Sequence, residues 1–210
     1  MRGRVLRIGL VLAAAAAVIG VGVPSASAGL LSGVTNLLLP PCGTTTHAFS
    51  ALGDNAAYCA FANQGFENGA SGWTLKGDAS VVSGNEPWNV SGPGRSSLEL
   101  GPGASASSTP LPISLLDPYI RFFAQSDGAS GSLQVQVVFR GILGNLTGLL
   151  NYGSLSPSGF SRWQATAPIR SWLALPLLTS SAQIVVTNTS RSGSWQVDDF
   201  YLDPCVSRLL

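Results

Sequence analysis

The sequence predicts an all-β fold, an antiparallel β-sandwich or barrel. Short apolar runs recur along the chain, Gly, Pro, Ser and Asn separate them, and no amphipathic segment is long enough for a helix. The clearest run is SLQVQVVFRG, in which Leu133, Val135, Val137 and Phe139 alternate with residues that are mostly polar. This alternation places the four apolar side chains on one face and predicts a half-buried strand.

The other predicted strands are equally short apolar runs. Turn residues bound each of them, and these keep the strands to a few residues. The segment 171–178 could hold one helical turn, but Pro176 interrupts it. In chain order, the predicted strands lie within residues 58–66, 72–77, 78–84, 96–102, 104–110, 119–125, 132–141, 162–168, 182–188 and 195–202.

The N-terminus reads as a secretory signal peptide, residues 1–28. Arginines precede an apolar run from Ile8 to Val23, and small residues precede a cleavage point after Ala28. The alternative is a retained membrane anchor, although the run is short for a span. We therefore expect a secreted protein, extracellular or associated with the cell wall. Residues 29–58 lack a sustained period and are interpreted as an extended lead-in to one domain, residues 59–210.

Removal of the signal peptide takes three of the 11 basic residues, so 8 remain against 10 acidic residues, a net charge of −2. A chain with so little positive charge has no electrostatic attraction to nucleic acid or to an anionic membrane. We expect neither as a partner, and we expect a monomer.

The three cysteines predict one disulfide and one odd thiol in an oxidising exterior. Cys59 begins the first apolar segment and Cys205 follows the last, so they are the preferred pair if the terminal strands are neighbours. The pairing of Cys42 with Cys59 stays open. The single histidine, His47, has no catalytic partner at a recognisable spacing, and we predict no enzymatic activity.

The strand near the C-terminus, WQVDDFYL, carries two adjacent carboxylates in an apolar setting. Trp195 and Val197 share one parity, while Phe200 and Leu202 share the other. One extra residue at the two aspartates, 198–199, would return all four apolar side chains to a single face. A β-bulge is therefore predicted there, with the aspartates at a bend.

Two segments, NQGFENGASGWTLKGDASVV and WQVDDFYLDP, resemble the terminal strands of carbohydrate-binding modules with the galactose-binding-like jelly-roll fold. The resemblance implies a jelly-roll β-sandwich in which Glu67 lies close to Asp198 and Asp199. A longer frame, from CGTTTHAFSALGDNAAY to VDDFYLDP, resembles a family of small secreted actinobacterial proteins of uncharacterised function. That second resemblance implies a fold and a compartment but no activity.

The carboxylates of Glu67, Asp198 and Asp199 suggest a structural calcium site. Calcium takes six to eight oxygen ligands, often from one or two carboxylates with backbone carbonyls for the rest. Glu67 with Asp198 or Asp199 supplies that minimum. The alternative is a set of acids that bind no metal and accept hydrogen bonds from a neighbouring loop, Arg95 or Arg191.

A sugar-binding surface is predicted around Trp88, which lies in the loop sequence SGNEPWNVSGPG. An aromatic ring can cover the apolar face of a pyranose, and Glu86 and Asn89 flank the ring as candidate partners for hydroxyl groups. Trp73 and Trp195 are interpreted as core residues. The predicted function is non-catalytic binding of an extracellular or cell-surface glycan; the alternative is a structural or adhesive protein without a sugar pocket.

Overall fold

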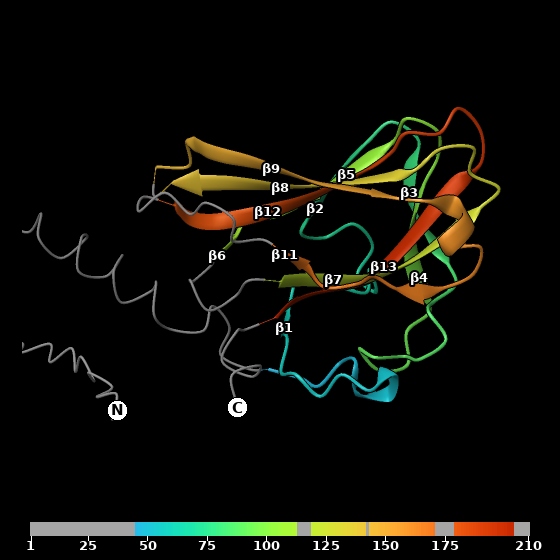
Figure 1. The fold of residues 1–210 in the computed structure, drawn as a ribbon, viewed down its shortest axis with the longest axis horizontal. Coiled ribbons are helices and arrows are strands. Elements are labelled where there is room, and N and C mark those ends of the chain that lie inside the picture. Colours follow the sequence, from blue (N-terminus) through green and yellow to red (C-terminus); the bar gives the residue numbers. More distant parts are fainter. Residues whose placement is uncertain (1–44, 113–118, 142, 171–178, 204–210) are drawn as a thin grey trace, which may run out of the picture.

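The structure is a computed structural model that describes residues 45–112, 119–141, 143–170 and 179–203. Its two antiparallel sheets pack face to face, which confirms the predicted all-β sandwich (Figure 1). The seven-stranded sheet has the order β10-β7-β13-β4-β3, with β1 also paired to β13 and β11 to β7. The six-stranded sheet has the order β2-β5-β12-β8-β9, with β6 also paired to β12.

The elements alternate between the two sheets, since β4 leads to β5, β7 to β8, and β12 to β13 across the sandwich. This alternation is the jelly-roll connectivity. The strands are β1 (Cys59–Ala60), β2 (Trp73–Lys76), β3 (Ala79–Ser83), β4 (Ser96–Leu100), β5 (Ser105–Ser108), β6 (Leu111–Pro112), β7 (Tyr119–Asp127), β8 (Leu133–Gly141), β9 (Leu146–Leu155), β10 (Gln164–Ala165), β11 (Ile169–Arg170), β12 (Thr179–Asn188) and β13 (Ser194–Asp203). Within the described ranges the helices are two 3-10 turns, η1 (Ser50–Leu52) and η2 (Pro157–Gly159).

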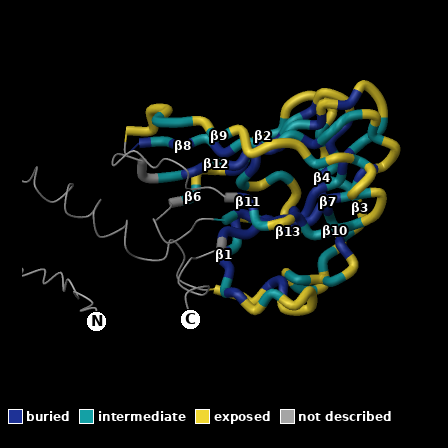
Figure 2. The backbone as a smooth tube through the Cα atoms, in the orientation of Figure 1, coloured by how far each residue is buried: buried dark blue, intermediate teal, exposed yellow. Residues whose placement is uncertain are grey.

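The main core fills the space between the two sheets (Figure 2). The alternating residues of β8 are buried as predicted, and so are Trp73 and Trp195. Phe200 lies at the centre of an aromatic group in this core, with its ring centroid 4.6 Å from that of Phe122 and 4.8 Å from that of Trp73. Dispersion and the loss of apolar surface to water hold the two sheets together through these rings.

The predicted β-bulge is confirmed on β13. The pairing of β13 with β7 shifts register between Asp198 and Tyr201, and Asp199 has a left-handed φ of 52°. As a result the two odd-numbered residues and the two even-numbered residues all lie in the main core: Trp195, Val197, Phe200 and Leu202. The aspartates themselves are buried, with 0% of their surface exposed, so they are more enclosed than a bend at the rim would leave them.

The lead-in prediction is wrong for residues 45–58, which pack on the outer face of the seven-stranded sheet. Phe49 and Tyr58 are fully buried there in a second apolar cluster with Phe123 and Tyr201. The domain therefore begins at or before residue 45 rather than at 59. The cause is that β7 and β13 carry aromatic residues on their outer face, and these rings are buried from water only when another segment packs over them.

A buried ion pair fixes this N-terminal segment to β7. The Arg121 guanidinium lies 2.6 Å from Asp54 Oδ2, and its Cζ lies 4.2 Å above the Phe49 ring centroid. Tyr58 donates a hydrogen bond from its hydroxyl to the same Asp54 oxygen at 2.6 Å, and Arg121 Nε donates to the Thr166 carbonyl at 3.0 Å. The charge of Arg121 is thus compensated although the residue is buried.

Several predictions lie outside the described residues. These are the signal peptide, residues 29–44, and both possible disulfide partners, Cys42 and Cys205. Cys59 is buried on β1 and is disulfide-bonded. Its register partner on β13 is Leu202. Because Cys205 lies outside the described residues, the preferred disulfide between Cys59 and Cys205 stays a prediction. Among the described residues, no helix is long and apolar enough to cross a membrane.

Candidate functional site

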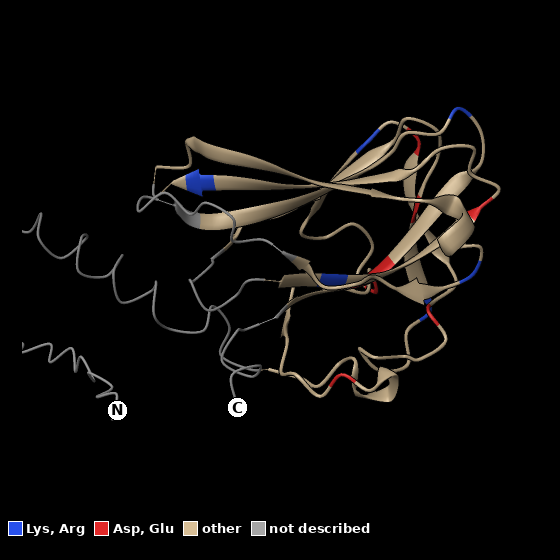
Figure 3. Ribbon diagram, viewed as in Figure 1, with Lys and Arg blue, Asp and Glu red and all other residues tan. Residues whose placement is uncertain are grey.

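Buried carboxylates gather where the bulge of β13 meets the loop between β3 and β4. Asp198, Asp199 and Glu86 are at most 1% exposed. The backbone N–H of Glu86 donates to Asp198 Oδ2 at 3.4 Å, and the N–H of Asp199 donates to Asp198 Oδ1 at 2.9 Å. Figure 3 shows how few charged residues the strands carry and places the acidic part of β13 beside β7.

Glu86 organises its own loop. Its Oε1 accepts a hydrogen bond from the Val90 N–H at 2.7 Å, and its Oε2 accepts one from the Trp88 N–H. The carboxylate therefore holds the turn that presents Trp88. Both oxygens are used inside the loop, and Glu86 is buried and is not among the residues that line the hollow described below, so the structure gives it a role in shaping the loop.

Asp199 differs from its neighbours because neither of its carboxylate oxygens has a hydrogen-bond partner, and both are buried. Beside it lies Gly65, where a Cβ atom would stand 3.1 Å from Asp199 Oδ1, 3.1 Å from Ser91 Oγ and 3.7 Å from Asp198 Oδ1. Three oxygens thus face the space that the missing Cβ leaves open. A buried carboxylate without a partner is costly, and such a group calls for a compensating proton or cation.

Burial is the main cause that raises the pKa of Asp198 to about 9, and the charge of Asp199 adds to it. Burial is also the main cause that raises the pKa of Asp199 to about 7; the nearby Ser91 hydroxyl acts against the rise, and the charge of Glu86 adds to it. The same burial, with the charge of Asp199, raises the pKa of Tyr201. The pair of aspartates therefore holds protons in the folded protein at a pH where it would be ionised in the unfolded chain.

We expect this difference to make the domain less stable as the pH rises. In the unfolded chain the aspartates lose their protons near pH 3.8, whereas in the folded protein they keep them up to about 7 and about 9. The folded state binds more protons in this window, so the contribution is complete at low pH and is lost as the pH rises through those values. In chelator, the contribution of the two aspartates to the melting temperature should fall as the pH rises from about 4 to about 9, most steeply below about pH 7, where both hold protons in the folded state only.

The matched variants for this pH dependence are Asp198→Asn and Asp199→Asn, which keep the shape and remove the titration. Asp199→Asn should reduce the slope below about pH 7, whereas Asp198→Asn should reduce it there as well and remove the fall between about pH 7 and about pH 9. A wild-type melting temperature that stays constant or rises across the same range would contradict the expectation.

The structure does not assemble the predicted calcium ligands as one set. Glu67 is exposed, and its Oε1 accepts hydrogen bonds from the backbone N–H groups of Arg95 at 2.8 Å and Ser96 at 2.9 Å. Among the described residues, no group of three or more Asp, Glu, His or Cys side chains is arranged to hold a metal ion. Hydrogen bonding to a neighbouring loop, the alternative considered for these acids, describes Glu67 and Asp198. It does not describe Asp199.

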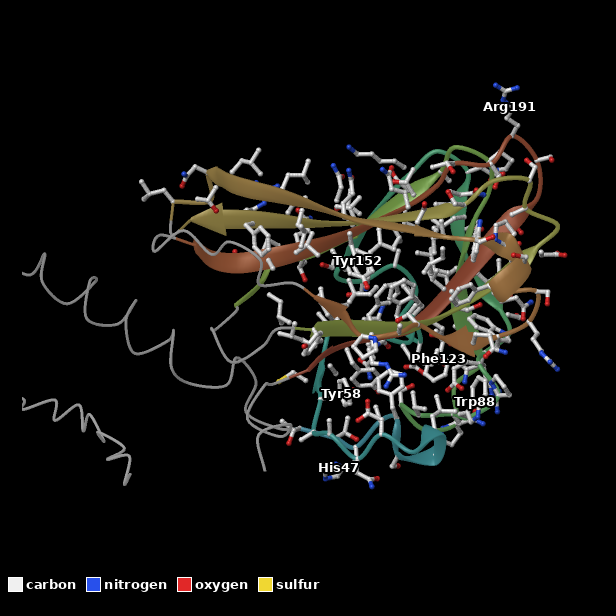
Figure 4. All side chains as sticks on the ribbon, in the orientation of Figure 1. His47, Tyr58, Trp88, Phe123, Tyr152 and Arg191 are labelled. Atoms are coloured by element: carbon white, nitrogen blue, oxygen red, sulfur yellow. The ribbon has the colours of Figure 1, made fainter. Side chains whose placement is uncertain are left out.

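A hollow of about 400 Å³ lies next to the Glu86 loop, on the outer side of the seven-stranded sheet. Trp88 borders it and is half-buried; its ring stacks on Phe123 with centroids 5.2 Å apart. Figure 4 shows Trp88, Phe123 and Tyr58 close together below the sheet, on the side that the N-terminal segment also covers. The hollow is lined by Pro87, Trp88, Gln125, Arg162, Trp163 and Gln164.

Of the three predicted sugar-binding residues, the structure brings only Trp88 to this hollow. Asn89 is exposed and has a left-handed φ of 50°. Its Oδ1 accepts a hydrogen bond from Asn85 Nδ2 at 3.2 Å, and its Nδ2 donates to the Pro87 carbonyl at 3.4 Å. Asn89 thus shapes the turn behind Trp88, because a left-handed backbone there suits asparagine.

Sequence reasoning missed the second half of the hollow, which comes from the start of β10 and from β7. Trp163 precedes β10, whose residue Ala165 pairs with Phe123. By strand alternation, Trp163 and Gln125 then share the outer face with Phe123. The available signal was the aromatic residue two positions before Ala165 in RWQATAP, but its partner strand cannot be read from local sequence.

No protein-family model matches the chain, and no curated protein matches it. Solved structures with a similar fold include the CBM22-1 xylan-binding domain from Paenibacillus barcinonensis Xyn10C, at 16% identity and a TM-score of 0.48 over 68% of this chain and 92% of that one. Another is TmCBM61 in complex with β-1,4-galactotriose, at 17% identity and a TM-score of 0.45 over 70% of this chain and 99% of that one.

A third is the family 11 carbohydrate-binding module from Clostridium thermocellum in complex with a β-1,3-1,4-mixed-linked tetrasaccharide. It is 18% identical, with a TM-score of 0.40 over 63% of this chain and 89% of that one. These three structural neighbours are carbohydrate-binding modules, and their likeness to this chain is one of general architecture.

Proposed function

We propose that this protein binds an extracellular or cell-surface glycan without catalysing a reaction, through the hollow between Trp88 and Trp163. The observation that carries the proposal is that two half-buried tryptophans border one hollow together with Gln125, whose side chain shares their face of the sheet, and the neighbouring residue Gln164. Indole rings cover the apolar C–H face of a pyranose, and amides both donate to and accept from hydroxyl groups. These are the two kinds of contact that sugar recognition needs.

Trp88 packs against the second apolar cluster and is only half-buried there, so it is held in place and still borders the hollow. One face of its ring stacks on Phe123, and the Glu86 carboxylate fixes the backbone of its loop. A side chain that is already ordered loses little conformational entropy when a ligand arrives. The proposed setting outside the cell is supported by the signal peptide that the sequence predicts.

The test is binding of the mature protein to a panel of polysaccharides, with Trp88→Ala and Trp163→Ala as the variants. Each substitution should weaken binding about tenfold or more, because loss of a stacking ring removes about 1.4 kcal/mol or more. Leu146→Ala is the matched control, since Leu146 is 63% exposed on β9 and does not line the hollow. Melting temperatures are compared in parallel.

A wild-type protein that binds none of the polysaccharides would contradict the proposal. The competing function, a structural or adhesive protein of the cell exterior without a sugar pocket, would then remain. Binding that survives both tryptophan substitutions would place the sugar elsewhere on the domain.

We propose separately that a calcium ion stabilises the bulge at Asp199. The support is the pair of buried Asp199 oxygens without partners, together with the space beside Gly65 that Ser91 Oγ and Asp198 Oδ1 also face. Carboxylate and hydroxyl oxygens are hard ligands of the kind that calcium prefers. An ion there would supply the positive charge that the described residues do not give to Asp199.

We expect millimolar calcium to raise the melting temperature of the chelator-treated protein by several degrees, because a ligand of the folded state at about a hundred times its dissociation constant adds about 2.7 kcal/mol. Asp199→Asn should remove the rise. Gly65→Ala should reduce it by filling the space, and Glu67→Gln reports whether the predicted ligand takes part. An unchanged wild-type melting temperature would leave these acids as hydrogen-bonded and protonated groups.

A further inference from the structure

Arg162 is the charged side chain among the residues that line the Trp88–Trp163 hollow. The remaining lining residues are two tryptophans, two glutamines and a proline, and none of them is acidic. We propose that the hollow selects acidic saccharides that carry a carboxylate, such as uronic acid units, and that Arg162 is the residue that determines this specificity. The inference rests on the proposed glycan-binding function and deepens it.

The Arg162 side chain is exposed and has no ion-pair partner among the described residues. The ion pair found there is that of Arg121 with Asp54. Arg121 is buried and bound to the N-terminal segment, so the two arginines differ in kind. An arginine at the mouth of a hollow with no carboxylate of the protein against it is available to one from a ligand.

The loop beside the hollow, residues 84–95, directs no negative charge toward it. Glu86 is the acidic residue of that loop, and both of its oxygens accept hydrogen bonds from loop N–H groups. Along the sheet, Glu99 on β4 lies two strands from Gln125, and its Oε2 accepts a hydrogen bond from Gln196 Nε2 at 3.5 Å. Arg162 therefore dominates the charge at the hollow itself.

The lining groups match the chemical groups of a uronic acid. The apolar ring face fits against indole, the hydroxyl groups fit the Gln125 amide, and the planar carboxylate fits the two parallel N–H groups of a guanidinium. A neutral hexose leaves the guanidinium with a hydroxyl, which is a weaker acceptor. The expected preference for the charged sugar is about tenfold or more.

The test uses polygalacturonate and its fully methyl-esterified form, which share a backbone and differ in whether each carboxyl group is ionised or capped as a neutral methyl ester. Binding is measured by calorimetry at constant ionic strength with the mature protein. Wild type should bind the acid form at least about tenfold more tightly than the ester. Arg162→Gln should remove this difference while the melting temperature stays the same, because the side chain is exposed. Arg191→Gln is the matched control, an exposed arginine that Figure 4 shows on the opposite side of the molecule from Trp88.

Equal affinity for the two forms would overturn the inference and leave the proposed function standing, as would binding to neutral polysaccharides alone. Binding to dextran sulfate, which carries sulfate groups and no carboxylate, as strong as to polygalacturonate and with equal loss in Arg162→Gln, would also overturn it, since the hollow would then recognise negative charge in general rather than a carboxylate. A failure of both tryptophan variants to affect any binding would overturn the proposed function together with this inference.

Discussion

Replacement of Phe200 by alanine should destabilise the domain by about 3–5 kcal/mol, a large share of the about 5–15 kcal/mol that holds a typical domain together. The Phe200 side chain is fully buried at the centre of the core. Its loss would leave a cavity that rings from three different parts of the chain cannot fill without leaving their own positions. Its aromatic neighbours, by centroid distance, are Phe122 at 4.6 Å, Trp73 at 4.8 Å, Phe66 at 6.1 Å and Phe61 at 6.4 Å.

The measurement is urea unfolding of wild type and variant. Phe200→Leu should cost less, because it retains part of the volume, and Leu146→Ala on the exposed side of β9 should change stability by no more than about 0.5 kcal/mol. A loss below about 1 kcal/mol for Phe200→Ala would show that the core can collapse around the missing ring.

Asp54→Ala should produce the second largest loss, about 2–3 kcal/mol. Breaking a buried ion pair costs about 3–5 kcal/mol when one charge is left alone, and this pair is somewhat less enclosed. The side chains of Arg121 and Asp54 are 11% and 22% exposed. Without Asp54, Arg121 keeps the Thr166 carbonyl and the Phe49 ring but has no negative charge beside it. Hydrogen exchange over residues 45–58 should rise more than over β8 and β12.

A double variant, Asp54→Ala with Arg121→Met, should regain part of the loss, because it removes the stranded charge as well. Asp127→Ala is the matched control, because Asp127 is an exposed aspartate on β7, the strand that also carries Arg121. Exchange that rises uniformly over the domain in Asp54→Ala would mean that the ion pair serves global stability rather than the attachment of this segment.

Local pattern could predict the strands whose apolar residues keep a regular spacing along the chain, or break it at one point. Alternation marks β8 directly, and the parity break between Val197 and Phe200 in β13 marks the bulge. Both patterns arise because a side chain's face is fixed by its position along the strand. In β9 the pattern fails. Leu149 is 54% exposed while Leu150 packs against the core, and Gly148 and Gly153 interrupt the run, so an edge strand of ten residues was not predicted.

The candidate site could not be predicted in the same way, because its residues contact partners that are distant in the sequence. Glu86 was predicted to bind sugar because it flanks Trp88, yet its carboxylate is used by the amides of its own loop. Trp163 was not assigned, because its place beside Trp88 follows from the pairing of β10 with β7 across about forty residues of chain. Local sequence shows which residues can do chemistry; only strand pairing shows which of them meet.

The ring of Phe123 contacts two segments at once: Phe49 at 5.4 Å and Trp88 at 5.2 Å, both stacked. Any version of this protein shortened to begin at residue 59 would therefore lose one side of the support on which the Trp88 loop rests, although the shortened chain would retain every strand of the sandwich. Such a fragment could fold and still give a false negative in a glycan screen. Activity assays on this domain should use chains that retain residues 45–58.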